Sequence, residues 1–208
     1  MNIEDAKQQL NKFYTDKLNE HGVSPLGVGW NSKDSQEIRF EQLLKICDAS
    51  RPFSILDYGC GYGALADYLM EKGFQADYHG FDIIEKMILK ARQNRTGKPN
   101  CNFTIDESQV PVCDYVVASG IFNFCSDADF EPWTEHVISV LHRFDALSRK
   151  GFASNCMTKY SDADRMRPEL YYADPCYLFD YCKRNFSKNV ALLHDYTLYD
   201  FTILVRKG

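Results

Sequence analysis

The residues best suited to do chemistry lie in one short segment, Asp57-Tyr58-Gly59-Cys60-Gly61-Tyr62-Gly63. It follows the apolar run of residues 54–56 and precedes a helical pattern over residues 64–69, so we expect a turn from a strand into a helix. A glycine at every second position leaves no Cβ between the backbone amides and a bound ligand. The spacing therefore predicts a turn that holds a nucleotide-like cofactor, with Asp57 beside it.

Two kinds of cofactor fit this glycine string. Gly59-x-Gly61-x-x-Ala64 also satisfies the dinucleotide-binding pattern, and Asp82 follows about 20 residues later, where a ribose would need a carboxylate. A pyrophosphate would meet the negative charge of Asp57 at close range, whereas a ligand with an ammonium and a sulfonium would be stabilised by it. We also expect no separate domain after the sheet to hold a dehydrogenase substrate.

The chain alternates strand-like and helix-like segments from residue 54 onward. Strands are expected at 54–58, 78–83, 101–105, 115–118 and 151–157, and helices at 63–72, 84–91, 133–147 and 174–186. The last two strands, 190–193 and 201–205, are joined by only seven residues and must pair antiparallel. The pattern predicts an α/β three-layer sandwich with a mostly parallel seven-stranded sheet and an antiparallel C-terminal hairpin.

Two further helices, 4–20 and 32–48, are expected ahead of the sheet. The length of 208 residues fits one domain, in which residues 1–50 form an N-terminal helical cap and residues 51–208 a Rossmann-like core. Between these helices, residues 22–30 form a glycine-rich linker that is too apolar for a disordered tail.

Composition narrows the class of partner. A net charge of −5 disfavours a nucleic-acid surface, although a local basic patch could exist under an acidic total. The first residues lack the pattern of a signal peptide, and no apolar run reaches the length of a membrane span, so we expect a cytoplasmic protein without a membrane partner. The eight cysteines include no Cys-x-x-Cys and no zinc-finger spacing, which favours free thiols and predicts no metal site.

Together these motifs resemble those of the class I S-adenosylmethionine-dependent methyltransferases, over roughly residues 50–208. The resemblance rests on Asp57-x-Gly59-x-Gly61-x-Gly63, Asp82 at the end of the second strand, the Asp106-Glu107-Ser108 loop and the closing hairpin. It implies S-adenosylmethionine as the cofactor. The cofactor-binding residues that it implies are Asp57, Gly59, Cys60, Gly61, Gly63, Asp82, Ile83, Met87, Asp106, Glu107 and Ser119.

By the same resemblance, the three glycines would pass under the methionine part of the cofactor, and Asp57 would order that loop and face the ammonium. Asp82 would accept hydrogen bonds from the ribose hydroxyls. Ile83 and Met87 would flank the adenine, and Asp106 and Glu107 would lie near its amino group. Ser119, or Gly120 beside it, would line the floor next to the reactive methyl.

The molecule that accepts the methyl group is less well defined by the sequence. The Asn-Pro-Pro-Tyr motif of amino-methylating nucleic-acid enzymes is absent after the fourth strand, where residues 119–124 read Ser-Gly-Ile-Phe-Asn-Phe. This favours a small metabolite, anionic or aromatic, over a nucleic acid. The residues that we predict to bind it are Trp30, Arg39, Asn123, Arg167 and Tyr171. Trp30 could equally be a packing contact at a capped helix, and residues 165–172 an exposed basic turn.

The predicted catalytic residues are His194 and Tyr172. His194 is the best base candidate because its free pKa lies near neutrality, although a structural histidine in a hairpin fits equally well. His136 and His142 are expected to face solvent. The main hypothesis is a methyltransferase acting on a small molecule. The alternatives are a protein or RNA methyltransferase, a non-catalytic cofactor-binding module of the same fold and, more distantly, a nicotinamide-dependent oxidoreductase.

Overall fold

The computed structural model describes residues 3–95, 100–125 and 130–208. The helices are α1 (Ile3–His21), α2 (Lys33–Leu44), α3 (Ala64–Glu71), α4 (Glu85–Asn94), α5 (Phe130–Leu147) and α6 (Pro175–Asn185), with 3₁₀ turns at Leu26–Val28, Glu107–Gln109 and Ala163–Arg165. The strands are β1 (Phe53–Tyr58), β2 (Ala76–Phe81), β3 (Cys101–Thr104), β4 (Cys113–Ala118), β5 (Ser148–Thr158), β6 (Tyr172–Ala173), β7 (Asn189–Leu193) and β8 (Asp200–Arg206).

One twisted sheet runs through the molecule in the order β3-β2-β1-β4-β5-β8-β7, with β6 paired to β5 outside this path. β1 to β5 pair in parallel, and β8 runs antiparallel to both β5 and β7. The predicted α/β sandwich with its C-terminal hairpin is confirmed. The eighth strand, β6, falls in the segment that the sequence suggested to be a loop.

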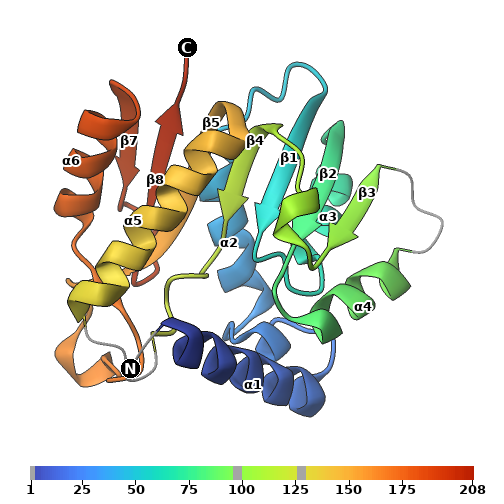
Figure 1. Ribbon diagram of the computed structural model, residues 1–208, viewed down its shortest axis with the longest axis horizontal. Helices are drawn as coiled ribbons and strands as arrows, with labels where there is room; N and C mark the ends of the chain where they lie inside the picture. The colour runs from blue at the N-terminus through green and yellow to red at the C-terminus, as the bar shows by residue number, and fades with distance from the viewer. Residues whose placement is uncertain (1–2, 96–99, 126–129) are drawn as a thin grey trace.

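Two apolar layers cover the sheet, one on each face (Figure 1). Successive strand residues contribute to the two layers in turn. Ile55, Tyr115 and Val117 pack toward α2, α3 and α4. Their neighbours Leu56 and Val116 pack toward α5 and α6. This period of two is the pattern of a sheet buried on both faces.

The predicted bounds of several elements differ from the structure by two or more residues, and two of these elements are explained by their contacts. The second helix ends at Leu44 rather than at residue 48, since the chain turns there and the carbonyl of Lys45 accepts a hydrogen bond from Arg206 Nη2 at 2.7 Å. The fifth strand is longer than predicted at both ends, because it pairs with β4 on one side and β8 on the other.

α1 lies across the end of the sheet at which the parallel strands finish (Figure 1). In a parallel α/β sheet, ligands bind at the carboxyl ends of the strands. The N-terminal segment therefore covers the edge at which the glycine turn and Asp82 lie.

Candidate functional site

The glycine turn joins β1 to α3 in a backbone conformation that side chains oppose. Gly59, Gly61 and Gly63 have φ angles of +83°, +53° and +82°. A Cβ added at Gly59 would lie 2.2 Å from Cγ2 of Ile121, in the loop after β4. The turn therefore requires glycine both for its φ angles and for the close approach of Ile121.

The turn is fixed from two sides before any ligand binds. The N–H groups of Gly59 and Cys60 both donate to the carbonyl of Phe81, at 2.7 and 2.9 Å. Arg95, buried at the end of α4, donates to the carbonyls of Tyr62 (2.9 Å) and Gly63. Sequence reasoning missed Arg95; its only signal is a cation just after the helix that follows Asp82.

Asp82, directly after β2, is tied to the same turn. Its Oδ2 accepts a hydrogen bond from Gly61 N at 2.8 Å, and its Oδ1 accepts one from Ile84 N at 2.9 Å. Burial raises the pKa of Asp82 to about 6, and these backbone donors act in the opposite direction. A carboxylate offers about four lone-pair sites, so acceptor capacity remains for a further donor such as a sugar hydroxyl.

Asp57 is the next-to-last residue of β1 and lies just before the turn. Its Oδ2 accepts a hydrogen bond from the hydroxyl of Tyr78 at 2.6 Å, and only 4% of the residue is exposed. Burial raises the pKa of Asp57 to about 7, although the Tyr78 hydrogen bond lowers it. A buried carboxylate of this kind is stabilised by a positive group, such as an ammonium, brought close to it.

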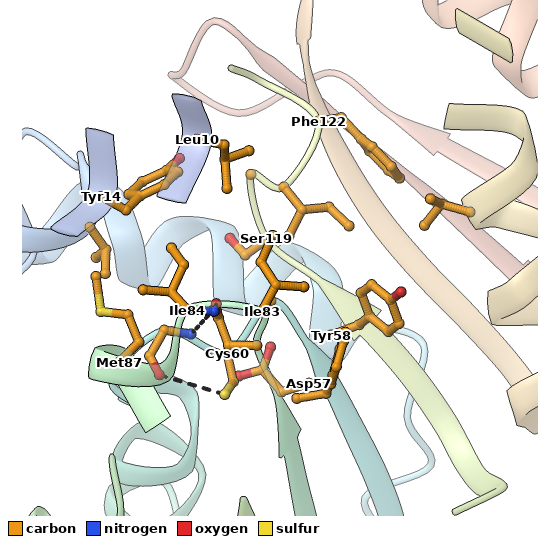
Figure 2. A pocket seen from close by; sticks show the side chains of 18 of the residues that line it. Leu10, Tyr14, Asp57, Tyr58, Cys60, Ile83, Ile84, Met87, Ser119 and Phe122 are labelled. Carbon is orange, nitrogen blue, oxygen red and sulfur yellow. Dashed lines mark hydrogen bonds between the residues drawn. The ribbon is translucent and has the colours of Figure 1, made fainter. Parts of the chain in front are cut away.

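A cavity of about 710 Å³ runs past these residues, within the range of small-molecule and cofactor sites. Leu10 and Tyr14 of α1 lie across it from Asp57 and Cys60 (Figure 2). Most of the residues predicted to bind cofactor line it: Asp57, Gly59, Cys60, Gly61, Asp82, Ile83, Met87, Glu107 and Ser119. Of the predicted acceptor-binding residues, Trp30 lines it.

Two further walls close this cavity. The N-terminal segment supplies what we call the cap wall, formed by Leu10, Tyr14, Val28, Trp30, Gln36 and Phe40. The other, the α5 wall, includes Trp133, His136, Ser139, Val140, His142 and Arg143. His136 and His142 thus border the cavity as well; of these two residues, which were expected to face solvent, His142 is exposed and His136 is half-buried.

Glu107 connects the α5 wall to the strand ends. Its Oε1 accepts hydrogen bonds from the Tyr58 hydroxyl at 3.0 Å and from Arg143 Nε at 2.8 Å. Asp106 beside it does not line the cavity, because its carboxylate accepts hydrogen bonds from the N–H and hydroxyl of Ser108. Gly63 is likewise absent from the lining; it lies behind the turn, against Arg95 and Phe103.

The floor of the cavity beyond Asp82 is formed by Ser119 and Gly120, which follow β4. Gly120 has a φ of +73°, its N–H donates to Asn155 Oδ1 at 2.7 Å, and the ring of Trp30 lies directly against it. The Ser119 hydroxyl is buried and has no hydrogen-bond partner within the described ranges. Asn155 was missed from the sequence, where its signal is a polar residue inside the apolar fifth strand.

The two predicted catalytic residues lie outside the cavity lining. His194 is exposed at the end of β7, where its ring is near those of Tyr160 and Phe201. Tyr172 is buried in β6, and its hydroxyl accepts a hydrogen bond from Arg167 N at 2.9 Å. Neither predicted catalytic residue therefore lines the cavity; the pairing of β6 with β5 holds Tyr172 at the sheet.

Four predicted acceptor-binding residues are also absent from the cavity lining. Arg39 forms a buried ion pair with Asp200. Asn123 Oδ1 accepts a hydrogen bond from Met157 N at 3.2 Å, and the Tyr171 hydroxyl lies 2.8 Å from that of Thr134. Arg167 is exposed, with Nε 3.4 Å from Glu169. Their contacts are with the protein itself, although Arg39 supports the cavity indirectly through Trp30.

The residues present fit the cofactor that the motifs imply. The glycine turn supplies a surface without Cβ atoms, Asp82 supplies acceptor oxygens, and Ser119 supplies a buried hydroxyl that has no partner in the part of the chain that the structure describes. Over the described ranges, no three His, Cys, Asp or Glu side chains gather as a metal site would require. Nor is any described helix long and apolar enough to cross a bilayer.

Comparisons with known proteins agree with this site. Residues 55–143 match the family described as "Methyltransferase domain". The chain is 52% identical, over 165 residues, to the Mycobacterium tuberculosis protein named "Putative methyltransferase Rv1506c", covering 79% of this chain and 99% of that protein.

Solved structures of the same fold have low sequence identity. Human N-acetylserotonin methyltransferase, in complex with S-adenosylmethionine, superposes with a TM-score of 0.66 at 16% identity; all of this chain is covered, but it spans only 60% of the human one. NodS, an N-methyltransferase from Bradyrhizobium japonicum in complex with S-adenosylhomocysteine, gives 0.64 at 13% identity, with 94% and 97% covered.

The fold and the cofactor cavity define a class I methyltransferase, and the relative at 52% identity places the chain in that family. It is an S-adenosylmethionine-dependent enzyme.

Proposed function

We propose that this enzyme methylates a small molecule that enters between the cap wall and the floor at Ser119 and Gly120. The observation that supports this most directly is the roof of the cavity. Leu10 and Tyr14 of α1 line it opposite Asp57 and Cys60 (Figure 2), so the N-terminal helix covers part of a cavity whose volume of about 710 Å³ is that of small-molecule sites.

The cofactor would be held by residues at or just after the carboxyl ends of the parallel strands. Asp57 would stabilise its ammonium and Asp82 its ribose hydroxyls. Ile83 and Met87 would contact the adenine, and Glu107 would lie near its amino group. When bound, the cofactor supplies an electrophilic methyl carbon: an acceptor lone pair forms the new bond to it while the C–S bond breaks, and that electron pair stays on sulfur.

The protein's task is then to align the acceptor and exclude water. Ser119, Gly120 and Trp30 are fixed by packing and by Asn155, so they would hold the acceptor at one position over the floor. The cap wall contains no histidine and no carboxylate. A nucleophile that needs no proton removal before attack, such as an uncharged amine, would need no base from this wall, whereas a hydroxyl would need one from elsewhere in the lining, such as His136 of the α5 wall.

Two measurements on the full-length protein test this function. Isothermal titration should detect binding of S-adenosylhomocysteine. Incubation with methyl-labelled cofactor and a cell extract should place the label in the low-molecular-mass fraction. Label found in the protein or RNA fraction instead would overturn the small-molecule assignment, and binding of the cofactor without any transfer would favour a non-catalytic module.

A further inference from the structure

None of the residues predicted for the site lies on α1, yet this helix lines the cavity. Leu10 and Tyr14, four residues apart, both belong to the lining, and Leu18, a further four residues along, is buried. Residues at this spacing share one face of a helix. That face of α1 is therefore turned toward the carboxyl ends of the strands.

This face of α1 packs on the segments assigned to the cofactor. Leu18 and three other residues form a small buried apolar cluster: Tyr62, Ile84 and Met87. Tyr14 packs against this cluster, which is separate from the two apolar layers of the sheet. Tyr62 belongs to the glycine turn, and the other two cluster residues follow Asp82. α1 is thus in contact with the cofactor side of the cavity.

Tyr14 lies at the end of the cavity where the nucleoside part of the cofactor is expected. Figure 2 shows it on the same side as Met87, whereas Tyr58 lies on the opposite side. Burial is the main cause of the raised pKa of Tyr14, about 12, and the charge of nearby Asp82 adds to it. Since Met87 would contact the adenine and Asp82 the ribose, Tyr14 faces the nucleoside from the cap side.

Tyr14 keeps a surface for a ligand. Its ring meets that of Phe13 at 84°, with the ring centres 5.1 Å apart, and a Cβ added to Gly29 would lie 3.7 Å from its Cε1, an ordinary van der Waals distance. Its hydroxyl is not fully buried, and within residues 3–95, 100–125 and 130–208 it has no hydrogen-bond partner. Because its pKa is raised, this hydroxyl is protonated at neutral pH and can donate to a ligand.

We propose that Tyr14 binds the nucleoside part of the cofactor from the cap side, so that adenine and ribose lie between α1 and the segment after Asp82. This inference rests on the proposed function, because it places the ribose at Asp82. It has a consequence for the fold: the bound cofactor stabilises the docked position of α1, because it adds a contact that the ligand-free helix lacks.

Two ligands locate the contact: S-adenosylhomocysteine, and 5′-methylthioadenosine, which keeps the nucleoside but lacks the amino-acid part. Both are titrated calorimetrically into the full-length protein. Tyr14→Ala should weaken the binding of both at least about tenfold, because the ring and the hydroxyl are lost together. Tyr14→Phe loses only the hydroxyl and should weaken both by about two- to tenfold. Unchanged affinities in these variants, or a loss confined to S-adenosylhomocysteine, would overturn the proposal.

Two further variants serve as references. Lys12→Ala, on the outer face of the same helix, should bind both ligands as the wild type does, since its side chain is 79% exposed. Asp57→Asn should weaken S-adenosylhomocysteine more than 5′-methylthioadenosine, which has no ammonium to meet that carboxylate. If wild-type protein did not bind S-adenosylhomocysteine, the proposed function would fail together with this inference. A Tyr14→Ala variant that binds normally would refute this inference alone.

Hydrogen exchange adds a readout of α1 itself. Saturation with S-adenosylhomocysteine should slow amide exchange in α1 at least about threefold in the wild type, and less in Tyr14→Ala. α6, which contributes no residue to the cavity lining, is the internal reference and should change less. The ligand-free Tyr14→Ala variant shows in the same experiment whether α1 is still formed; if it is not, the affinities of Tyr14→Phe decide. No slowing of α1 in the wild type would contradict the proposal.

Discussion

The carboxylate of Asp82 and the N–H of Gly61 meet at 2.8 Å, although the two residues lie on different strand ends. This contact joins the glycine turn after β1 to the acidic residue after β2, the two parts of the motif that implied the cofactor. The second oxygen of Asp82 fixes the start of α4 through Ile84 N. The turn is thus preorganised, and little ordering remains when the cofactor binds.

Asp82→Asn should weaken S-adenosylhomocysteine binding by about 1–3 kcal/mol, because an amide group replaces one of two acceptor oxygens and faces either a backbone donor or a ribose hydroxyl. Titration calorimetry measures the loss. Asp77→Asn, an exposed change on the same strand, is the matched control and should bind like the wild type. An unchanged affinity in Asp82→Asn would show that the ribose assignment is wrong.

Cofactor binding should release protons near neutral pH. Burial raises the pKa of Asp57 to about 7 and that of Asp82 to about 6, so both are partly protonated below neutrality in the free protein. A ligand ammonium and ribose hydroxyls favour the carboxylates, and binding must therefore lower both pKa values. Affinity for S-adenosylhomocysteine should rise as the pH increases from about 5 to 8 and then level off. Calorimetry in two buffers of different ionisation enthalpy counts the protons; net uptake would refute the prediction.

Gly59→Ala should abolish most cofactor binding. Its Cβ would lie 2.2 Å from Ile121 Cγ2, at a φ of +83° that alanine avoids, so either the turn or the loop after β4 must move. The strain should also cost about 1–3 kcal/mol of stability in a urea titration. Gly73→Ala is a close control, since Gly73 has a φ of +77° but nothing within 4 Å of the added Cβ. It should lose stability from the backbone alone and keep its affinity; equal affinities in both variants would count against the prediction.

Arg39→Met should destabilise the protein by about 3–5 kcal/mol at pH 8, because it leaves the carboxylate of Asp200 buried without its partner. Burial already raises the pKa of Asp200, and Arg39 lowers it. Without Arg39 the carboxyl protonates more readily, so the loss should be smaller at pH 5 than at pH 8. The double variant Arg39→Met/Asp200→Asn should recover part of the stability at pH 8. Additive losses in urea unfolding would argue against a coupled pair.

The fold was predicted well from the sequence, and most of the residues assigned to the cofactor line the cavity, because both depend on local patterns. Three glycines at alternate positions and a carboxylate at each of two strand ends follow directly from the backbone that they must form. The acceptor side depends on which loops reach the cavity. This is decided by contacts between residues far apart in the chain, which local sequence patterns do not predict. His194 follows β7 but is exposed outside the cavity lining, and Tyr172 is held in β6 by the pairing of that strand with β5.

Buried polar partners were also hard to predict. Asn155, Asp200 and Arg95 are single polar residues within or beside apolar segments, and each has a partner that lies 32 or more residues away in the chain. Trp30 was identified from its place before a capped helix, but only the structure shows that Arg39 supports it from behind.

The crystal structure of the full-length protein with S-adenosylhomocysteine would test the central claim most directly. The ribose hydroxyls should lie within hydrogen-bond distance of the Asp82 carboxylate, with the sulfur directed toward the space between Ser119 and Trp30. A ligand bound elsewhere, or a ribose that does not contact Asp82, would contradict the account.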